Sequence, residues 1–327
     1  MTSGRSLCYR DAKLVNATVS RLEAVSRTGS LRTIIMSSSV SRRALFEGLG
    51  AALALPAIEA ADFVGAPTAS TIARGGNSYV NSRKVLLWEN TRKEFREAIE
   101  GGVLKAVIVP CGSCEQHNEH LAMIHDTASV TLVAHQAALQ LYPQVMLTPP
   151  VSVGISPHWM DRKGTLSLRR ETFLAVVFDI CDSLKTHGVR NILILNGHGG
   201  NQAPLAQSVE EFRSKLGINI QAHSYWRAYS AEIIKKYMES GVVPGHAAEF
   251  ETSFAMAAFP ERVHWEGVDY EKAKPLLHIK DPASAKEEEK FAREAKLAST
   301  AKGEAMIAIA MNWVADQLRQ MSANAAA

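Results

Sequence analysis

The chain contains the stretch Lys105-Ala-Val-Ile-Val-Pro110, a short and continuous apolar run of the kind that buried parallel strands show. It leads directly into Cys111-Gly-Ser-Cys-Glu-Gln-His-Asn-Glu-His-Leu-Ala-Met-Ile-His-Asp126, which holds three carboxylates and three imidazoles. Clustered carboxylates repel one another and lose hydration in a folded domain unless a cation offsets them. The stretch therefore predicts a buried strand followed by a metal-binding loop.

Apolar runs and helical patterns alternate on both sides of this stretch. Strands are expected at 105–110, 145–148, 191–195 and 218–226, and helices at 91–101, 127–141, 171–188, 204–216 and 228–240. Such alternation predicts an α/β fold with a mostly parallel sheet covered by helices on both faces. Residues 285–321, rich in Ala, Lys and Glu, predict one or two long surface helices.

Two further polar motifs follow at expected element boundaries. Asn196-Gly-His-Gly-Gly-Asn201 comes directly after the third apolar run, and Gly245-His-Ala-Ala-Glu-Phe-Glu-Thr-Ser253 opens a helical pattern. Ligands of parallel sheets bind beyond the carboxyl ends of strands, where the connecting loops meet. The three motifs are therefore expected to converge on one cleft.

Together the motifs resemble those of the creatininase (creatinine amidohydrolase) family of metal-dependent amide hydrolases. Its members carry P-x-G-S-x-E-Q-H-x-x-H-L, an Asp eleven residues after that Glu, N-G-H-x-x-N and H-x-x-x-x-E-T-S, and all of these occur here in order between Val85 and Val263. The resemblance implies a three-layer α/β/α catalytic domain over residues 85–325. It also implies two divalent metal ions per subunit, Zn or Mn with Fe as a further option, and a homo-oligomer such as a hexamer.

Four metal ligands are carried over from the family at matching positions. The resemblance places Glu115 on one ion, His117 on the other, Asp126 as the bridge between them and His198 as a further ligand. Glu115 and His117 are two residues apart, so in an extended loop they point the same way and can flank a pair of ions.

The fifth ligand is where the chain departs from creatininase proper. That enzyme carries a ligating Glu two residues after the His of N-G-H, and here the position is Gly200. Family members with Gly there usually carry a Glu three residues after the later His, so Glu249 is the expected fifth ligand, with Glu251 as the competitor and otherwise a catalytic carboxylate. The missing Glu also makes creatinine itself a less favoured substrate.

The remaining candidate residues surround the expected substrate. His246 opens the third motif, resembles the catalytic His of the family and is expected to supply the proton for the leaving nitrogen. The expected pocket residues are His120, His158, Gly199, Gly200 and Trp226. His120 is expected to position a ligand from behind rather than to bind metal, and Trp159 and Trp226 either wall the pocket or belong to the core.

Three classes of function stay open at this point. The favoured one is a hydrolase that cleaves a non-peptide C–N bond in a cyclic amide, lactam or formamide-like small molecule with a metal-bridging hydroxide. The alternative is an exported metal- or ligand-binding protein without turnover. A thiol–disulfide protein is disfavoured, because Cys111 and Cys114 have redox spacing but flank the metal loop and not a helix N-terminus.

Composition excludes some partners and sets the N-terminus apart. The 327 residues carry a net charge of +3, but the first 61 hold eight Lys or Arg and four Asp or Glu, which leaves a net charge of about −1 for the rest. A surface that binds nucleic acid is therefore not expected. Ser41-Arg-Arg-Ala-Leu-Phe-Glu47 and the short apolar run after it predict a twin-arginine signal over residues 36–61, hence a periplasmic protein with no stable membrane span. Residues 1–35 are expected to be untranslated or a leader extension, and 62–84 a linker.

Overall fold

The computed structural model describes residues 84–324 except 278 and 280. The expected leader extension, the expected twin-arginine signal and all but the last residue of the expected linker lie outside the described residues. Among the helices that are described, none combines the length and the apolar character that crossing a bilayer requires.

Four parallel strands form the sheet in the order β2-β1-β3-β4. They are β1 (Ala106–Cys111), β2 (Val145–Leu147), β3 (Asn191–Asn196) and β4 (Asn219–Ser224). Every neighbouring pair is parallel, and the register of β1 and β3 places Cys111 beside Asn196. The loops that carry the first two polar motifs therefore leave the sheet next to each other, and the predicted parallel α/β fold is confirmed.

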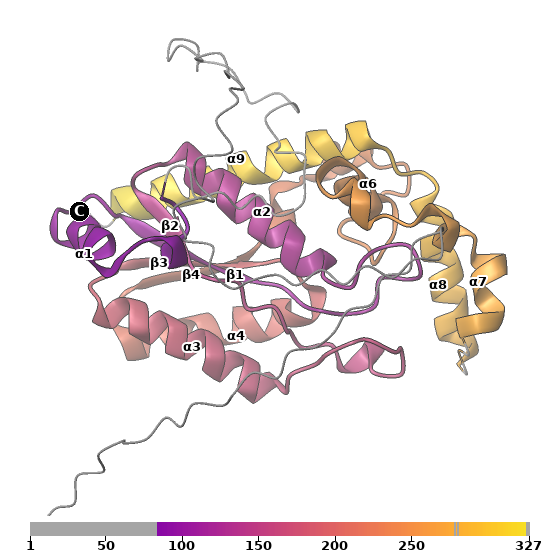
Figure 1. Ribbon diagram of the computed structural model, residues 1–327, viewed down its shortest axis with the longest axis horizontal. Coiled ribbons are helices and arrows are strands. Elements are labelled where there is room, and N and C mark those ends of the chain that lie inside the picture. Colours follow the sequence, from indigo (N-terminus) through magenta and orange to yellow (C-terminus); the bar gives the residue numbers. More distant parts are fainter. Residues whose placement is uncertain (1–83, 278, 280, 325–327) are drawn as a thin grey trace, which may run out of the picture. The chain divides into compact units, whose positions relative to one another are not determined.

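Helices cover both faces of this sheet. The first face carries α2 (His125–Gln140), α6 (Glu249–Ala258) and α9 (Thr300–Asn324), and the second carries α3 (Arg170–Thr186) and α4 (Gly199–Leu216), as Figure 1 shows. Because side chains alternate along a strand, Ile108 and Leu193 belong to the first hydrophobic core while Val107 and Ile192 belong to the second.

Element boundaries differ from expectation where a strand or helix adjoins a motif. α4 begins at Gly199, directly after His198, and not at Pro204. β4 stops at Ser224 and continues as a 3-10 turn over Tyr225–Ala228, and α5 is short, spanning Ala231–Tyr237.

α1 spans Arg92–Glu100 and begins with a capping box in which the Thr91 hydroxyl accepts from the Glu94 amide.

The expectation of surface helices at the C-terminus is wrong for α9. This helix packs against α2 and α6, and Met306, Ile307, Val314 and Leu318 are fully buried. A Cβ at Gly303 would lie 1.9 Å from the Ser253 carbonyl oxygen, so only glycine lets the two helices approach this closely. The abundance of Ala in the segment reflects tight helix packing and not solvent exposure.

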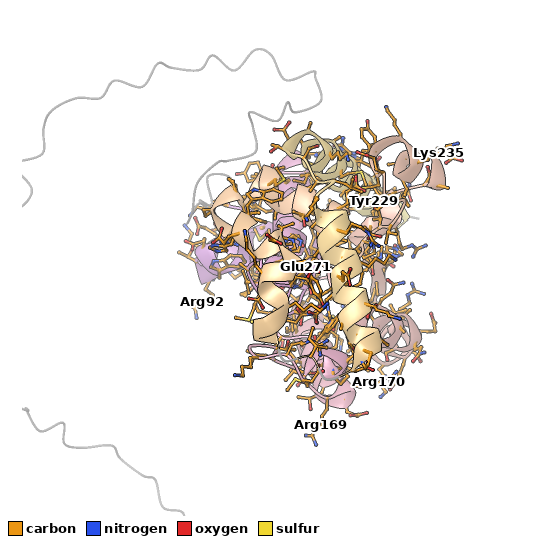
Figure 2. All side chains as sticks on the ribbon, turned by 90° about the vertical axis from the view of Figure 1, so that its right-hand side faces the viewer. Arg92, Arg169, Arg170, Tyr229, Lys235 and Glu271 are labelled. Atoms are coloured by element: carbon orange, nitrogen blue, oxygen red, sulfur yellow. The ribbon has the colours of Figure 1, made fainter. Side chains whose placement is uncertain are left out.

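The last two helices before α9, α7 (Tyr270–Leu277) and α8 (Pro282–Ala295), lie at one end of the domain. Figure 2 shows this end, with Glu271 of α7 facing the viewer and Arg169 and Arg170 projecting at its lower edge. Glu288 of α8 is buried and pairs with Arg162 of the loop after β2, Nε to Oε1 at 2.6 Å. This ion pair holds α8 against the loop that contains His158.

Replacing Ile307 by Ala is expected to lower the free energy of unfolding by about 2–5 kcal/mol, because a fully buried branched side chain is lost from a packed core. Gln320→Ala, at an exposed position on the same helix, is the matched control and should change it by less than about 0.5 kcal/mol. Urea-induced unfolding followed by circular dichroism measures both. Equal effects of the two substitutions would contradict the buried position of α9.

Candidate active site

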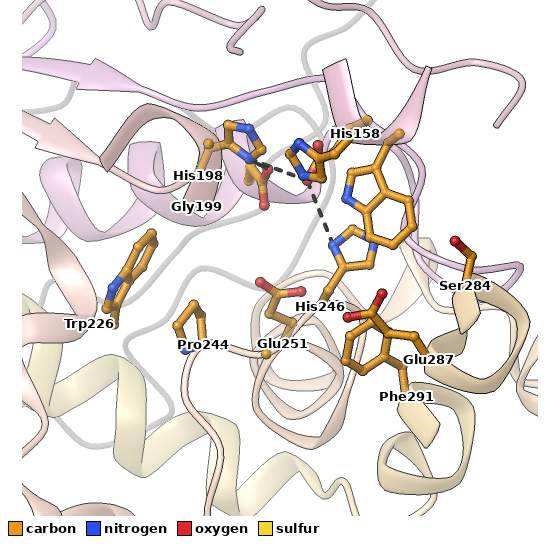
Figure 3. Close-up of a pocket in the computed structure, with 15 residues that line it drawn as sticks. His158, His198, Gly199, Trp226, Pro244, His246, Glu251, Ser284, Glu287 and Phe291 are labelled. Carbon is orange, nitrogen blue, oxygen red and sulfur yellow. Dashed lines mark ion pairs between the residues drawn. The ribbon is translucent and has the colours of Figure 1, made fainter. Parts of the chain in front are cut away.

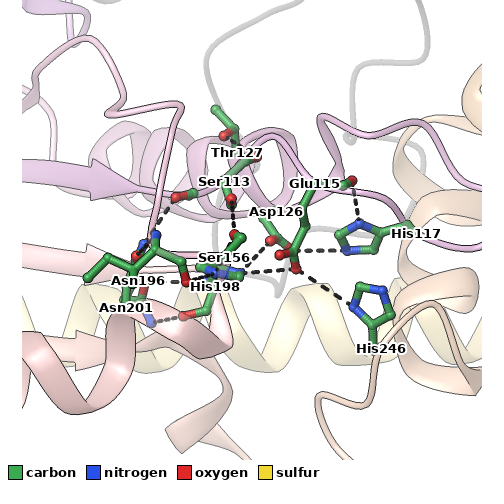
Figure 4. Close-up of polar contacts among 12 residues, drawn as sticks. Ser113, Glu115, His117, Asp126, Thr127, Ser156, Asn196, His198, Asn201 and His246 are labelled. Atoms are coloured by element: carbon green, nitrogen blue, oxygen red, sulfur yellow. Dashed lines mark hydrogen bonds and ion pairs between the residues drawn. The ribbon is translucent and has the colours of Figure 1, made fainter. Parts of the chain in front are cut away.

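Buried carboxylate and imidazole groups from separate segments meet at the carboxyl edge of the sheet. Glu115 and His117 come from the loop after β1, Asp126 from the first turn of α2, and His198 from the junction of β3 and α4. Figure 4 shows them converging, with His198 Nδ1 at 2.9 Å from Asp126 Oδ2 and 3.2 Å from Glu115 Oε1. On the other side of Asp126, its Oδ1 lies 3.1 Å from His117 Nε2. Asp126 thus stands between the two histidines.

Glu251, and not Glu249, completes this cluster. The Glu251 Oε2 atom lies 3.5 Å from His117 Nε2 and accepts the Ala247 amide at 2.6 Å. Glu249 and Glu251 both lie on α6, but residues two apart on an α-helix point about 200° away from each other. Only one of them can face the cluster.

The Glu249 carboxylate is engaged on the opposite side of α6, so its expected role as fifth ligand is corrected. It accepts the backbone amides of Glu239 at 3.0 Å and Ser240 at 2.7 Å, and it pairs with Lys302 of α9 at 2.5 Å. A fully buried carboxylate needs such partners, and Lys302 supplies the charge that a metal ion would otherwise supply. Glu249 anchors the segment before α6 instead.

The outer ring nitrogens of the two clustered histidines face carbonyl oxygens. His117 Nδ1 lies 3.1 Å from the Glu115 carbonyl, and His198 Nε2 lies 3.1 Å from the Ile155 carbonyl. A carbonyl oxygen only accepts, so each outer nitrogen carries a proton and donates it. In the neutral ring the inner nitrogen then presents its lone pair to the carboxylates, as a histidine ligand of a metal does.

The spacing of these atoms fits divalent ions. Two ligand atoms about 2.0–2.2 Å from one Zn²⁺, at angles near those of a tetrahedron or octahedron, lie about 3–3.5 Å apart. Among residues 84–324 as described, three groups offer one ligand atom per residue with all these atoms within 4.8 Å of one another. They are Glu115, Asp126 and His198; His117, Asp126 and Glu251; and Glu115, His117 and His246. The first two share Asp126, the arrangement that a bridging carboxylate between two ions requires. These residues support binding of divalent metal.

The electrostatics of the cluster favour positive charge. Burial lowers the pKa of His117 and of His198, but the carboxylates around them, Asp126 foremost, outweigh it and raise both values to about 10. The pKa of Asp126 is lowered, because His117 overcomes the effect of burial. Burial, with help from Asp126, raises the pKa of Glu251 to about 8. The Glu115 Oε2 atom has no hydrogen-bond partner among the described residues, which also suits a cation.

His246 borders the cluster and differs from the other two histidines. Its Nδ1 lies 3.7 Å from Glu115 Oε1, and its Nε2 lies 2.9 Å from the Gln116 side-chain nitrogen. The ring stacks on Trp159 with centroids 4.5 Å apart and meets Phe291 at 5.8 Å. Burial, followed by the positive charge of His117, lowers its pKa well below the usual value. His246 is therefore a neutral, fixed ring.

A cavity of about 580 Å³ opens over the cluster. Figure 3 shows Trp226 on one side of it, His158 above, and Glu251 and His246 at its base. His158, Gly199, Gly200 and Trp226, all expected in the pocket, line it together with Trp159. His120, also expected there, does not line it, because its buried ring lies behind the cluster and its Nε2 contacts Thr252 Oγ1 at 2.9 Å.

The structure also explains why this chain has no Glu at position 200. A Cβ at Gly200 would lie 2.0 Å from the Ile155 carbonyl oxygen and 2.6 Å from His198 Nε2. A side chain there would displace the acceptor that orients His198. Position 200 therefore supplies no side-chain ligand, and Glu251 is the carboxylate that reaches the cluster.

Sequence reasoning missed the wall that α8 contributes. Ser284, Glu287 and Phe291 line the cavity, although Glu287 and Phe291 come from the segment 285–321 that was expected to form surface helices. A lone Phe in a run of Ala, Lys and Glu was the one available signal. Cys111 and Cys114 are free thiols, and burial raises the pKa of the Cys111 thiol far above its usual range, which disfavours thiolate chemistry.

Several known proteins are similar to this chain. The family model of creatininase, described as creatinine amidohydrolase, matches residues 88–318. The creatinine amidohydrolase of Pseudomonas putida is 28% identical over 262 residues, which cover 73% of this chain and 98% of that protein. A 3-dehydro-scyllo-inosose hydrolase of Thermotoga maritima is 30% identical over 181 residues, 54% of this chain and 57% of that protein. A solved structure of a mutant creatininase of the Zn-Zn type has a TM-score of 0.62 and 25% identity, covering 72% of this chain and 97% of that one.

Glu251→Gln and Glu249→Gln are expected to separate metal binding from stability. The first removes a charged oxygen from the cluster and should weaken metal retention about 10- to 100-fold. The second leaves Lys302 without its buried negatively charged partner and should cost about 1–3 kcal/mol of stability with metal content unchanged. Metal analysis after dialysis and thermal unfolding measure the two effects, and the reverse pattern would restore Glu249 as the ligand.

Metal uptake is expected to release protons. Because the pKa values of His117 and His198 are raised to about 10, both rings hold a second proton at neutral pH in metal-free protein, and a metal ion must displace it. Affinity should therefore rise with pH up to about 10 and fall as pH decreases. Titration calorimetry in two buffers of different protonation enthalpy counts the protons. Uptake without proton release would show that these rings are already neutral in the metal-free protein and would contradict their raised pKa values.

Proposed function

The chain belongs to the creatininase (creatinine amidohydrolase) family, and from this premise we propose that it is a hydrolase, dependent on two divalent metal ions, that cleaves a non-peptide C–N bond in a small amide. The observation that carries the proposal is the pair of ligand groups that share Asp126 beneath a single cavity. Groups of this kind, with two ions sharing a carboxylate, are typical of metal-assisted hydrolysis.

Each residue of the site would have its own role in such a reaction. Two divalent ions held by Glu115, Asp126, His198, His117 and Glu251 would make a nucleophile available at neutral pH and polarise the amide carbonyl. Gly199 and Gly200 line the cavity at the beginning of α4, and their backbone N–H groups precede the first hydrogen bond of the helix. These N–H groups are placed to stabilise negative charge that develops on the carbonyl oxygen. His246 faces the same space and is the group from which the substrate would receive a hydrogen bond or a proton.

The cavity favours a compact and partly flat substrate. Trp159, Trp226 and Phe291 supply aromatic walls, while Ser284 and Glu287 supply polar groups from α8. A cyclic amide or lactam fits such walls, because a planar amide stacks on aromatic rings and its edge makes hydrogen bonds. Creatinine is not favoured, because Gly200 stands where creatininase proper has a Glu. The names of the relatives, one for creatinine and one for an inosose, show that family membership does not fix the substrate.

Activity against a panel of cyclic amides, lactams and formamides is expected to vanish on chelation and to return when Zn²⁺ or Mn²⁺ is added. His198→Ala should abolish turnover with loss of metal, while His246→Asn should retain metal and lose about 10²- to 10⁴-fold in kcat. His187→Ala, at an exposed histidine directly after α3, is the control. Metal-loaded protein that hydrolyses nothing in the panel would favour a binding protein without turnover. Hydrolysis that survives chelation would overturn the metal-dependent mechanism.

A further inference from the structure

We propose that Gln116 fixes the ring proton of His246 on Nδ1, the nitrogen that faces Glu115, and thereby makes His246 a neutral hydrogen-bond donor to the substrate and not a third histidine ligand. Gln116 is then a positioning residue that lies between two ligand residues, Glu115 and His117. The inference deepens the proposed function and rests on it, because only a substrate bound over the metal ions would use this proton.

The orientation of the Gln116 side-chain amide is set by chemistry. Its Oε1 lies 2.9 Å from the backbone nitrogen of Asn118, and a backbone N–H can only donate. The oxygen must therefore face Asn118. Turning the amide over would place NH₂ against N–H in a position that is 8% exposed, where water cannot compensate. The backbone of Gln116 is held as well, since its N–H donates to Thr165 Oγ1 at 3.1 Å.

Because the side-chain oxygen of Gln116 accepts from Asn118, the side-chain nitrogen faces His246. The distance from this nitrogen to His246 Nε2 is 2.9 Å, a hydrogen bond in which the amide must donate and the ring must accept. A ring that accepts at Nε2 holds its proton at Nδ1. A doubly protonated ring is excluded in this pose, because it would point N–H at NH₂.

The three histidines of the candidate ligand groups are thus sorted by the partner of their outer nitrogen. His117 and His198 face carbonyl oxygens, which take the proton outward and leave a lone pair toward the carboxylates. His246 faces an NH₂ group, which keeps the proton on the inner side. The same ring chemistry therefore yields two ligands and one donor, and the difference lies in a single neighbouring side chain.

The inner proton of His246 is available to a substrate. Nδ1 lies 3.7 Å from Glu115 Oε1, beyond hydrogen-bond distance, and His246 lines the cavity. Stacking on Trp159 and the edge contact with Phe291 hold the ring plane, so the donor keeps its direction. A fixed neutral donor stabilises charge on the reacting oxygen or nitrogen without having to give its proton away.

Nitrogen-15 NMR of histidine-labelled protein tests the inference directly. In wild type, with and without Zn²⁺, the signals that disappear in His246→Asn are expected to show a protonated Nδ1 and an unprotonated Nε2. In Gln116→Glu, which keeps the size of the side chain, a carboxylate can only accept, so protonation is expected to move to Nε2. The inner lone pair of His246 would then be free to bind metal, and the variant should lose on the order of 10²-fold in kcat and retain metal more tightly.

A proton on Nε2 of His246 in wild type would overturn the inference, and so would an unchanged tautomer in Gln116→Glu. Folded Gln116→Asn, which is too short to reach the ring, should show a mixture of tautomers, and a single Nδ1–H form there would also count against it. The NMR result does not depend on turnover. If His246 carries its proton on Nδ1 but the protein hydrolyses no amide, the inference stands and the proposed function fails. If the protein is an active enzyme but His246 carries its proton on Nε2, the proposed function stands and the inference fails.

Discussion

A buried carboxylate held between two imidazoles is the constraint on which the rest of the structure depends. Asp126 contacts His117 with one oxygen and His198 with the other, and all three side chains are almost completely buried. Such a group tolerates little displacement, because each charge relies on its neighbours for the solvation that water cannot give. Its place in the first turn of α2 adds the favourable field of a helix N-terminus. The loops after β1 and β3 have to meet at this point.

Much of the architecture could be predicted from the sequence because its causes are local. The apolar runs of β1 and β3 are too short and too continuous to be half-exposed elements, and the polar motifs that follow them mark their carboxyl ends. Parallel pairing then places those ends side by side without further information. The convergence of Glu115, Asp126 and His198 follows from this rule and from the family motifs together.

What could not be predicted depends on partners far away along the chain. Nothing near Glu249 in the sequence indicates that Lys302 neutralises it, and spacing within the family favoured the wrong carboxylate of the two on α6. The burial of α9 was hidden in the same way, because small residues suit a tight helix interface and an exposed helix equally well. The tautomer of His246 depends on the side chain of Gln116 and on the local turn at Asn118, neither of which a motif records.

The ion pair between Arg162 and Glu288 joins α8 to the loop after β2. These two segments form a part of the cavity wall that is separate from the candidate metal ligands. The atoms that would carry out the reaction lie on sheet-edge loops and α6, whereas much of the rim that a ligand meets first comes from α8 and the loop fastened to it. Exchange of α8 residues other than Phe291, which contacts the His246 ring, could therefore change what is recognised while the chemistry beneath stays intact. A scaffold divided in this manner is well suited to diversification by substitutions on one helix.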